Sequence, residues 1–221
     1  MGRECWNNLS NVNCLGTLTL KRSQIADFNL FAESLSRHDF EISISSGVVR
    51  LFVIHLASKE TFTLGFFGSE IVYVPAARYE GLEFKYEAIS TSVLSINRIE
   101  GFHAAERLRR FNSHMLLMNW SLALSIIACS KSTEQKIERL IVTLTFRFGV
   151  RNTNGYCLPF TISHQRQSEI LGCTRSTVTR YMLSLRRSGM IEVQGYDKAW
   201  IVSETLMSKH EIFVEGLFSQ A

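Results

Sequence analysis

Residues 171–193, LGCTRSTVTRYMLSLRRSGMIEV, carry four arginines and three threonines in a run of otherwise helical character. Apolar residues recur there at steps of three and four and predict the buried face of a helix: Val178, Tyr181, Met182 and Leu185. The predicted outward face consists of Arg175, Ser176, Thr179, Arg180, Leu183 and Arg187. Guanidinium groups make paired hydrogen bonds with phosphate oxygens or with the O6 and N7 atoms of guanine. The outward face is therefore suited to an anionic surface.

A second helical segment precedes this one, and a short hairpin follows it. His164–Leu171 is predicted to be a helix that starts at Ser163, and Gly172 supplies a turn between the two helices, as in a helix-turn-helix. Thr174 is placed to cap the second helix. Residues 190–203 read as two strands around a tight turn, which would form a wing. An arginine-rich helix face is usually only solvated, but its combination with a helix pair, a turn and a wing favours DNA recognition.

The N-terminal half has a different pattern. Residues 15–100 are rich in Val, Ile, Phe, Tyr and Thr in short runs broken by glycines, and they predict a small barrel or sandwich. The predicted strands are GVVRLFVIHL, ETFTLGFFG, EIVYV and YEAISTSVLSI. After Gly101 the apolar period changes to three and four residues and predicts a long helix. Its apolar stripe consists of Phe111, Met115, Met118, Leu122, Ile126 and Cys129.

The long helix is apolar on more than one side, because Leu116, Leu117 and Ile127 lie off the main stripe. It is either a buried core helix or a helix packed between its own domain and a second copy of the chain. Soluble monomers rarely expose a contiguous apolar patch. We therefore expect a dimer that pairs these helices around a two-fold axis.

The segment SKSTEQ interrupts the helical pattern. Ser132 and Gln135 fit a capping box, so a new helix is predicted to begin there. Further on, RNTNGY is predicted to be a polar turn and CLPFTI a short strand. These breaks predict three parts: a sensor-like domain at 15–100, a dimerisation helix at 101–131 and a DNA-binding domain at 132–221.

Composition and cysteine spacing exclude several classes of protein. Hydrophobic residues make up 46% and charged residues 20% of the 221 residues, which is ordinary for a soluble protein. The five cysteines are scattered without a CxxC pair, which argues against a zinc ribbon and for reduced thiols. The N-terminus lacks the apolar region of a secretory signal, and residues 115–129 are too short and too polar to span a membrane. We therefore expect a cytoplasmic protein without membrane association.

Residues 148–180, FGVRNTNGYCLPFTISHQRQSEILGCTRSTVTR, resemble the CRP/FNR superfamily of bacterial transcription regulators. Within that superfamily, the pieces FGV, NG, SHQ and TRSTVTR resemble the cyanobacterial global nitrogen regulators. The resemblance implies an α+β fold with an N-terminal cupin-like β-roll sensor domain, a long dimerisation helix and a C-terminal winged helix-turn-helix. It also implies a homodimer that binds an inverted repeat in double-stranded DNA and has RNA polymerase as a partner.

The resemblance assigns roles to individual residues. Gln165 matches the first-helix residue that approaches DNA, and Arg175 and Arg180 match the recognition-helix arginines, which are suited to reading guanine. Ser176 stands where the cyclic-AMP receptor branch has a glutamate, so a shifted half-site preference is expected. Gln167 occupies a position that is usually apolar, and the sequence does not explain it. The remaining candidate DNA-binding residues, mostly for phosphate contacts, are Ser163, Arg166, Thr174, Thr177, Thr179 and Arg187.

The cyclic-nucleotide pattern is incomplete. That pattern needs a Gly-Glu pair for the ribose and an Arg-Ser pair for the cyclic phosphate. Here the glutamate comes one place late in Gly68-Ser69-Glu70, and Leu82-Glu83 stands where the Arg-Ser pair should be. A phosphate would then meet an acidic side chain, so cyclic AMP is not supported as an effector.

The 2-oxoglutarate pattern is incomplete as well. Phe84 and Leu117 stand where the nitrogen regulators have the two arginines that hold this dicarboxylate, and only Arg78 or Lys85 offers a substitute. Cys5 and Cys14 do not supply the four ligands of an iron–sulfur cluster. We therefore predict no cofactor, and the effector is unknown or absent.

Two functions remain for comparison. The first is a homodimeric, sequence-specific transcription regulator, and the second is a protein-interaction module that kept this fold and lost specific DNA binding. An enzyme is not expected, because the sequence shows no nucleophile–base pairing, metal-ligand motif or phosphate loop.

Overall fold

The computed structural model describes residues 14–27, 40–69, 71–72, 80–98, 104–195 and 199–218. The chain divides into two compact units, Met1–Trp120 and Ser121–Ala221. None of the helices in the described ranges is long and apolar enough to cross a membrane.

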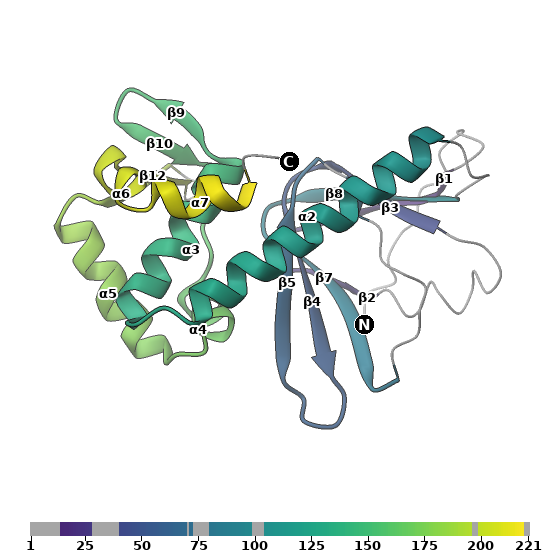
Figure 1. Ribbon diagram of the computed structural model, residues 1–221, viewed down its shortest axis with the longest axis horizontal. Helices are drawn as coiled ribbons and strands as arrows, with labels where there is room; N and C mark the ends of the chain where they lie inside the picture. The colour runs from purple at the N-terminus through teal and green to yellow at the C-terminus, as the bar shows by residue number, and fades with distance from the viewer. Residues whose placement is uncertain are drawn as a thin grey trace. The chain divides into compact units, whose positions relative to one another are not determined.

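The N-terminal unit is built from two four-stranded antiparallel sheets (Figure 1). The first sheet has the order β1-β8-β3-β6, with β1 at Cys14–Leu20, β8 at Ser92–Arg98, β3 at Phe40–Ser46 and β6 at Ile71–Val72. The second has the order β2-β7-β4-β5, with β2 at Ile25–Asp27, β7 at Leu82–Ala88, β4 at Val49–His55 and β5 at Thr61–Phe67. The β-rich character predicted for this part of the chain is confirmed.

One predicted strand is in fact two. YEAISTSVLSI contains the end of β7 at Ala88 and the start of β8 at Ser92. The turn between them is fixed from outside, because the backbone N–H of Val48 donates to the Ser90 hydroxyl at 2.9 Å and that of Ile89 donates to the Val48 carbonyl at 2.8 Å. The turn has no glycine or proline, so the run Ser90-Thr91-Ser92 is the signal that the local sequence offers for it.

Helix α2, Ala104–Ala128, has one buried side. Trp120 on that side is fully buried, and its ring centroid lies 5.4 Å from that of Phe66 in β5. A Cβ atom added at Gly65 would lie 2.7 Å from the Cβ atom of Trp120, so the absence of a side chain at Gly65 makes room for the tryptophan. Leu116 and Ile127 outside the main stripe are also buried, and Leu117 is half-buried.

In the C-terminal unit, the end of α2 is followed by α3, Thr133–Phe148. The predicted cap at Ser132 is confirmed, because its hydroxyl accepts a hydrogen bond from the backbone N–H of Gln135 at 3.2 Å. Further on the unit contains a four-stranded sheet of order β11-β12-β10-β9. Its strands are β9 at Val150–Asn152, β10 at Gly155–Leu158, β11 at Ile191–Gln194 and β12 at Ala199–Val202. The predicted wing corresponds to β11 and β12.

Two features of this unit differ from the prediction. The segment predicted as a polar turn does contain a turn, at Thr153-Asn154, but its flanks belong to the two strands of a β9–β10 hairpin. The strand predicted as CLPFTI ends at Leu158. In addition, the chain continues into two short helices that the sequence analysis did not predict, α6 at Glu204–Lys209 and α7 at Glu211–Phe218. Cation–π contacts bind α7 to α3: the guanidinium carbon of Arg139 lies 4.8 Å from the ring centroid of Phe213, and that of Arg147 lies 5.4 Å from the ring centroid of Phe218.

Candidate nucleic-acid interface

The C-terminal unit contains the predicted helix-turn-helix. Helix α4 spans His164–Leu171, and helix α5 spans Arg175–Arg187. The hydroxyl of Ser163 accepts from the backbone N–H of Arg166 at 3.2 Å, and the hydroxyl of Thr174 accepts from that of Thr177 at 3.2 Å, so both predicted helix starts are capped. Gly172 ends α4 with φ +60°, a left-handed conformation that favours glycine, and so allows the short turn.

The inner side of α5 is anchored in the core of the unit. Val178, Met182 and Leu185 are buried, as predicted. Tyr181 is half-buried, and its hydroxyl donates a hydrogen bond to Glu138 of α3 at 2.5 Å.

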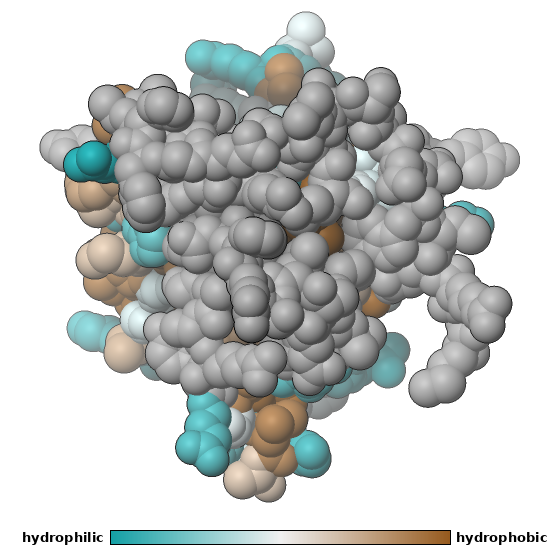
Figure 2. Space-filling model, turned by 90° about the vertical axis from the view of Figure 1, so that its right-hand side faces the viewer, coloured by the Kyte–Doolittle hydropathy of each residue, from teal (hydrophilic) through white to brown (hydrophobic). Residues whose placement is uncertain are grey.

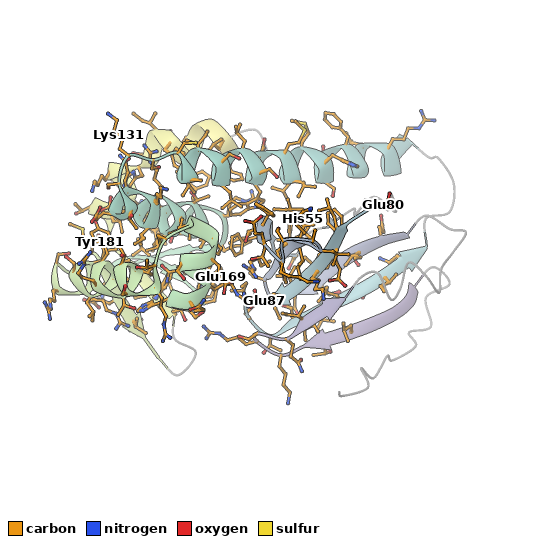
Figure 3. The ribbon with its side chains drawn as sticks, turned by 90° about the horizontal axis from the view of Figure 1, so that it is seen from below. His55, Glu80, Glu87, Lys131, Glu169 and Tyr181 are labelled. Atoms are coloured by element: carbon orange, nitrogen blue, oxygen red, sulfur yellow. The ribbon has the colours of Figure 1, made fainter. Side chains whose placement is uncertain are left out.

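Glu138 is the centre of a buried polar cluster. Its second carboxylate oxygen accepts from Lys209 Nζ at 2.6 Å and lies 2.8 Å from His210 Nε2. Burial alone would raise the pKa of Glu138, but the hydrogen bonds from Lys209, Tyr181 and His210 outweigh it and lower that pKa. Burial and the contact with Glu138 raise the pKa of Tyr181. The cluster therefore joins α3, α5 and the C-terminal helices around an ionised carboxylate (Tyr181 is labelled in Figure 3).

The outer side of α5 carries four exposed arginines: Arg175, Arg180, Arg186 and Arg187. Within the described part of the chain, none of these guanidinium groups has a carboxylate partner or a hydrogen-bond acceptor. Leu183 lies on the same side and is 44% exposed. Because the fold does not use these four charges, they remain available to a ligand.

Helix α4 differs from α5 in this respect. The guanidinium of Arg166 forms an ion pair with Glu169, three residues further along the helix (Glu169 is labelled in Figure 3). Gln165 is exposed, and its Nε2 donates to the other carboxylate oxygen of Glu169 at 3.2 Å. Glu169 thus neutralises Arg166, so the free positive charge of the helix-turn-helix is concentrated on α5.

Most candidate hydroxyls already have partners in the protein. The hydroxyl of Thr174 lies 2.9 Å from those of Ser176 and Thr177, and the Thr179 hydroxyl lies 3.0 Å from Nδ1 of His164. A hydroxyl can both donate and accept, so these groups keep capacity for a further bond. Thr174 and Ser176 are exposed, whereas Thr177 and Thr179 are half-buried.

Gln167, which the sequence analysis left unexplained, has a structural role. Its side chain is fully buried, and its Nε2 donates to the backbone carbonyl of Ile162 at 2.9 Å. An apolar side chain would leave this carbonyl without that bond. Gln167 therefore ties the start of α4 to the segment that precedes it and does not contact the exterior.

Sequence reasoning missed two residues that lie beside the predicted ones, His164 and Arg186. Both line a pocket of about 290 Å³ together with Arg175 and Gln165. Burial, Arg186 and Arg175 lower the pKa of His164, in that order of importance. Spacing was the available signal, because Arg186 follows Arg175 by three helical turns and lies on the same side of α5.

The predicted dimerisation residues lie on the exposed side of α2. Phe111, Met115, Met118, Leu122 and Ile126 are between 37% and 63% exposed, and Cys129 just after the helix is exposed too. Leu108, which was not predicted, extends this stripe by one turn and is 60% exposed. The stripe is apolar and separate from the buried side that carries Trp120.

The residues considered for an effector are only partly described. Lys85 forms an ion pair with Glu83 at 3.1 Å, and Phe84 between them is half-buried, while Arg78 and Glu70 lie outside the described residues. In the described ranges no group of three or more His, Cys, Asp or Glu side chains is placed to hold a metal ion.

The N-terminal unit also contains a buried ion pair that sequence reasoning missed. Arg50 Nε lies 2.8 Å from Glu87 Oε2, and both side chains are almost fully buried (Glu87 is labelled in Figure 3). At the surface of this unit, apolar side chains gather at the tip of the β4–β5 hairpin, at the lower end of Figure 2, where Leu56 and Phe62 are exposed.

Comparison with known proteins agrees with this geometry. Residues 135–205 match the model of the Crp-like helix-turn-helix domain. A CRP-family transcriptional regulator of Thermus thermophilus is similar in structure, with 16% identity, a TM-score of 0.65 and coverage of 89% of this chain and 95% of that one. A mutant of CooA from Carboxydothermus hydrogenoformans has 17% identity, a TM-score of 0.63 and coverage of 90% and 87%.

A third similar structure is the c-di-GMP-responsive global regulator CLP of Xanthomonas campestris, with 15% identity, a TM-score of 0.59 and coverage of 85% of this chain and 93% of that one. Among curated proteins, no sequence matches this chain. The predicted α+β fold is therefore confirmed: the chain has the fold of CRP/FNR regulators, with an N-terminal β-sheet domain and a C-terminal Crp-like helix-turn-helix domain.

Proposed function

We propose that this protein is a homodimeric, sequence-specific transcription regulator of the CRP/FNR type, which binds double-stranded DNA through α5. The observation that carries the proposal is the division of α5 into two sides. One side of α5 is buried in the core through Val178, Met182 and Leu185. The other side carries four exposed arginines that have no acidic partner in the described structure. A helix of this kind, presented by a helix-turn-helix, fits the major groove.

The outward arginines divide into two kinds of contact. Arg180 lies opposite the buried side of α5, near its middle, and we propose that it reads guanine, with Arg175 as a second reader. Arg187 lies two turns further along the same side, where the DNA backbone is the nearer target. By resemblance to the cyanobacterial nitrogen regulators, we propose half-sites related to GTA, with one position loosened by Ser176.

The exposed stripe of α2 supports the dimer. Six apolar side chains recur at steps of three and four along the helix, from Leu108 to Ile126. Pairing two such helices around a two-fold axis removes this surface from water. We expect light scattering at micromolar concentration to give the mass of a dimer, and a monomer at that concentration would contradict the proposal. Met118→Glu places a charge on the stripe and should shift the protein toward monomer.

The proposed regulator does not bind cyclic AMP or 2-oxoglutarate at the positions that these ligands occupy in its relatives. Lys85, one of two possible substitutes for the missing arginines, is already paired with Glu83. We expect titration calorimetry to detect no saturable heat with either ligand at micromolar concentration. A saturable heat would contradict this part of the proposal.

The function is tested by selection from random DNA. Purified protein is mixed with a library of random-sequence duplexes, and the bound fragments are sequenced. The proposal predicts an enriched inverted repeat whose half-site centres lie about 34 Å apart. If no sequence is enriched, the alternative of an interaction module without specific DNA binding is favoured. As a regulator, the protein would act in the cytoplasm with RNA polymerase as a partner.

A further inference from the structure

The pocket beside α5 carries the positive charge of Arg186, which the proposed base contacts do not use, together with that of Arg175. It has a volume of about 290 Å³ and lies among the start of α4, one side of α5 and the wing strands. Its lining residues include no acid, and they are Thr161, Ile162, Ser163, His164, Gln165, Arg175, Arg186, Val193 and Trp200. Two arginines without a neutralising carboxylate in the lining make this pocket attractive to an anion.

The side chains of the pocket are arranged for a phosphate group. Arg175 and Arg186 reach it from opposite ends of α5. His164 has its Nδ1 atom 3.0 Å from the Thr179 hydroxyl, so that contact orients the ring and leaves Nε2 for a ligand. The first turn of α4 contains no acidic residue, and its backbone N–H groups add to the positive potential.

We propose that this pocket binds a phosphodiester group of the DNA backbone through Arg186 and protonated His164, so that each protomer takes up a proton when it binds DNA. The inference rests on the proposed function, because the polyanion is DNA. A backbone phosphate is favoured over a small anion because the pocket borders α4, α5 and the wing, the three parts of a winged helix-turn-helix that approach a duplex together.

Proton uptake follows from the charges around His164. In the free protein, burial, Arg186 and Arg175 disfavour the protonated imidazole and so lower the pKa of His164. The two arginines that face His164 both come from α5, and the wing contributes the uncharged side chains of Val193 and Trp200. The carboxylate of Glu169 in α4 already accepts a hydrogen bond from Gln165 and forms an ion pair with Arg166. A bound phosphate compensates the two arginines and attracts a proton to the ring. The affinity for DNA should therefore rise as the pH falls.

The test is the pKa of His164, measured by NMR of histidine-labelled full-length protein and assigned with His164→Gln. The probe is a random-sequence duplex, with inorganic phosphate as a second probe. We expect the duplex to raise the pKa of His164 in the wild-type protein and not in Arg186→Gln. The control is Arg151→Gln, which removes the same charge from β9, where Arg151 is paired with Glu204. This control should respond like the wild type.

Binding titrations give a second readout. We expect the affinity of the wild type for the random duplex to fall as the pH rises, with a slope that corresponds to the uptake of about one proton per protomer on binding. This dependence should flatten in His164→Gln. Arg186→Gln should weaken binding several-fold and make the salt slope shallower by about one per protomer. Arg186→Lys keeps the positive charge, so its salt slope should stay close to that of the wild type.

The outcomes separate this inference from the proposed function. Binding of the duplex with no change in the pKa of His164 overturns the inference alone. A rise in that pKa with inorganic phosphate and none with the duplex also overturns it, because the pocket is then a small-anion site. Loss of sequence preference with the pKa rise intact overturns the specific function and supports the inference. Absence of any DNA binding overturns both.

Discussion

Arg50 in the N-terminal unit and the arginines of α5 in the C-terminal unit occupy opposite environments. In the N-terminal unit, Arg50 is 1% exposed, and its Nε lies 2.8 Å from Glu87. Its NH1 atom donates to the Thr63 hydroxyl at 3.2 Å, and its guanidinium carbon lies 4.4 Å from the ring centroid of Phe52. In the C-terminal unit, the four arginines of α5 are exposed and have no such partners among the described residues.

The difference shows which charges belong to the fold and which are left for a ligand. A buried guanidinium is tolerated only when an acid and hydrogen bonds compensate the loss of water. An exposed guanidinium without an acid adds little to the stability of the fold. Arg50 is therefore a structural residue, whereas the arginines of α5 are candidates for binding. Arg166, exposed in part and paired with Glu169, lies between these extremes.

The largest expected effect is on stability. Arg50→Met removes the partner of a buried carboxylate, Glu87, and should lower the free energy of unfolding of the N-terminal unit by roughly 3–5 kcal/mol. Urea denaturation followed by tryptophan fluorescence measures this loss. Replacing both residues, as Arg50→Met with Glu87→Leu, should recover much of it, because no uncompensated charge remains. An unchanged midpoint for Arg50→Met would show that the ion pair does not support the fold.

A smaller effect is expected at the inner side of α5. Tyr181→Phe removes a hydrogen bond to the ionised Glu138 and should lower the free energy of unfolding by about 1.5–3 kcal/mol. Chemical denaturation of the variant and the wild type gives the difference. A decrease well below this range would mean that the hydrogen bond contributes little to fixing α5.

The same cluster predicts a pH dependence. The pKa of Glu138 is lower in the folded protein than its usual value, so its contribution to stability is present above that usual value. The contribution is lost as the pH falls through the folded pKa. Denaturation at several acidic pH values should show this loss in the wild type and not in Glu138→Gln. If the free energy of unfolding depends on pH in the same way in both proteins, Glu138 is not the source of this loss.

The smallest expected effects compare single arginines on the two helices. Arg187→Ala should weaken binding to specific and random duplexes alike and make the salt slope shallower by about one for each phosphate group that the variant no longer binds. Arg166→Ala should change the slope less, because Glu169 already neutralises this charge. Binding titrations at several salt concentrations measure both slopes. Equal changes in the salt slope for the two variants would show that the ion pair with Glu169 does not keep Arg166 from binding a phosphate group.

The sequence predicted those parts of the structure that depend on local patterns. The helix starts at Ser163 and Thr174 and the buried side of α5 follow from capping residues and apolar spacing, which act within a few residues. The ion pair of Arg50 and Glu87 could not be predicted, because it joins residues 37 positions apart through the pairing of β4 with β7. The pairing register is a property of the whole sheet.

Other features were missed for similar reasons. The pocket at His164 needs α4, α5 and the wing to be folded together before its charges converge. The C-terminal helices are short and gain their support from α3, through Arg139 and Glu138 among others, so their own sequence gives a weak signal. In contrast, the apolar stripe of α2 could be predicted, because all its residues lie in a single helix at regular spacing.

The central claim is that α5 reads DNA sequence, and Arg180 tests it most directly. The duplex enriched by selection and a scrambled version of it are titrated with wild-type protein and with Arg180→Ala. Loss of a paired hydrogen bond to guanine should weaken binding to the enriched duplex by roughly 1–3 kcal/mol and leave binding to the scrambled duplex nearly unchanged. If Arg180→Ala weakens binding to both duplexes equally, this arginine supplies only general charge, and the account of α5 as a recognition helix is wrong.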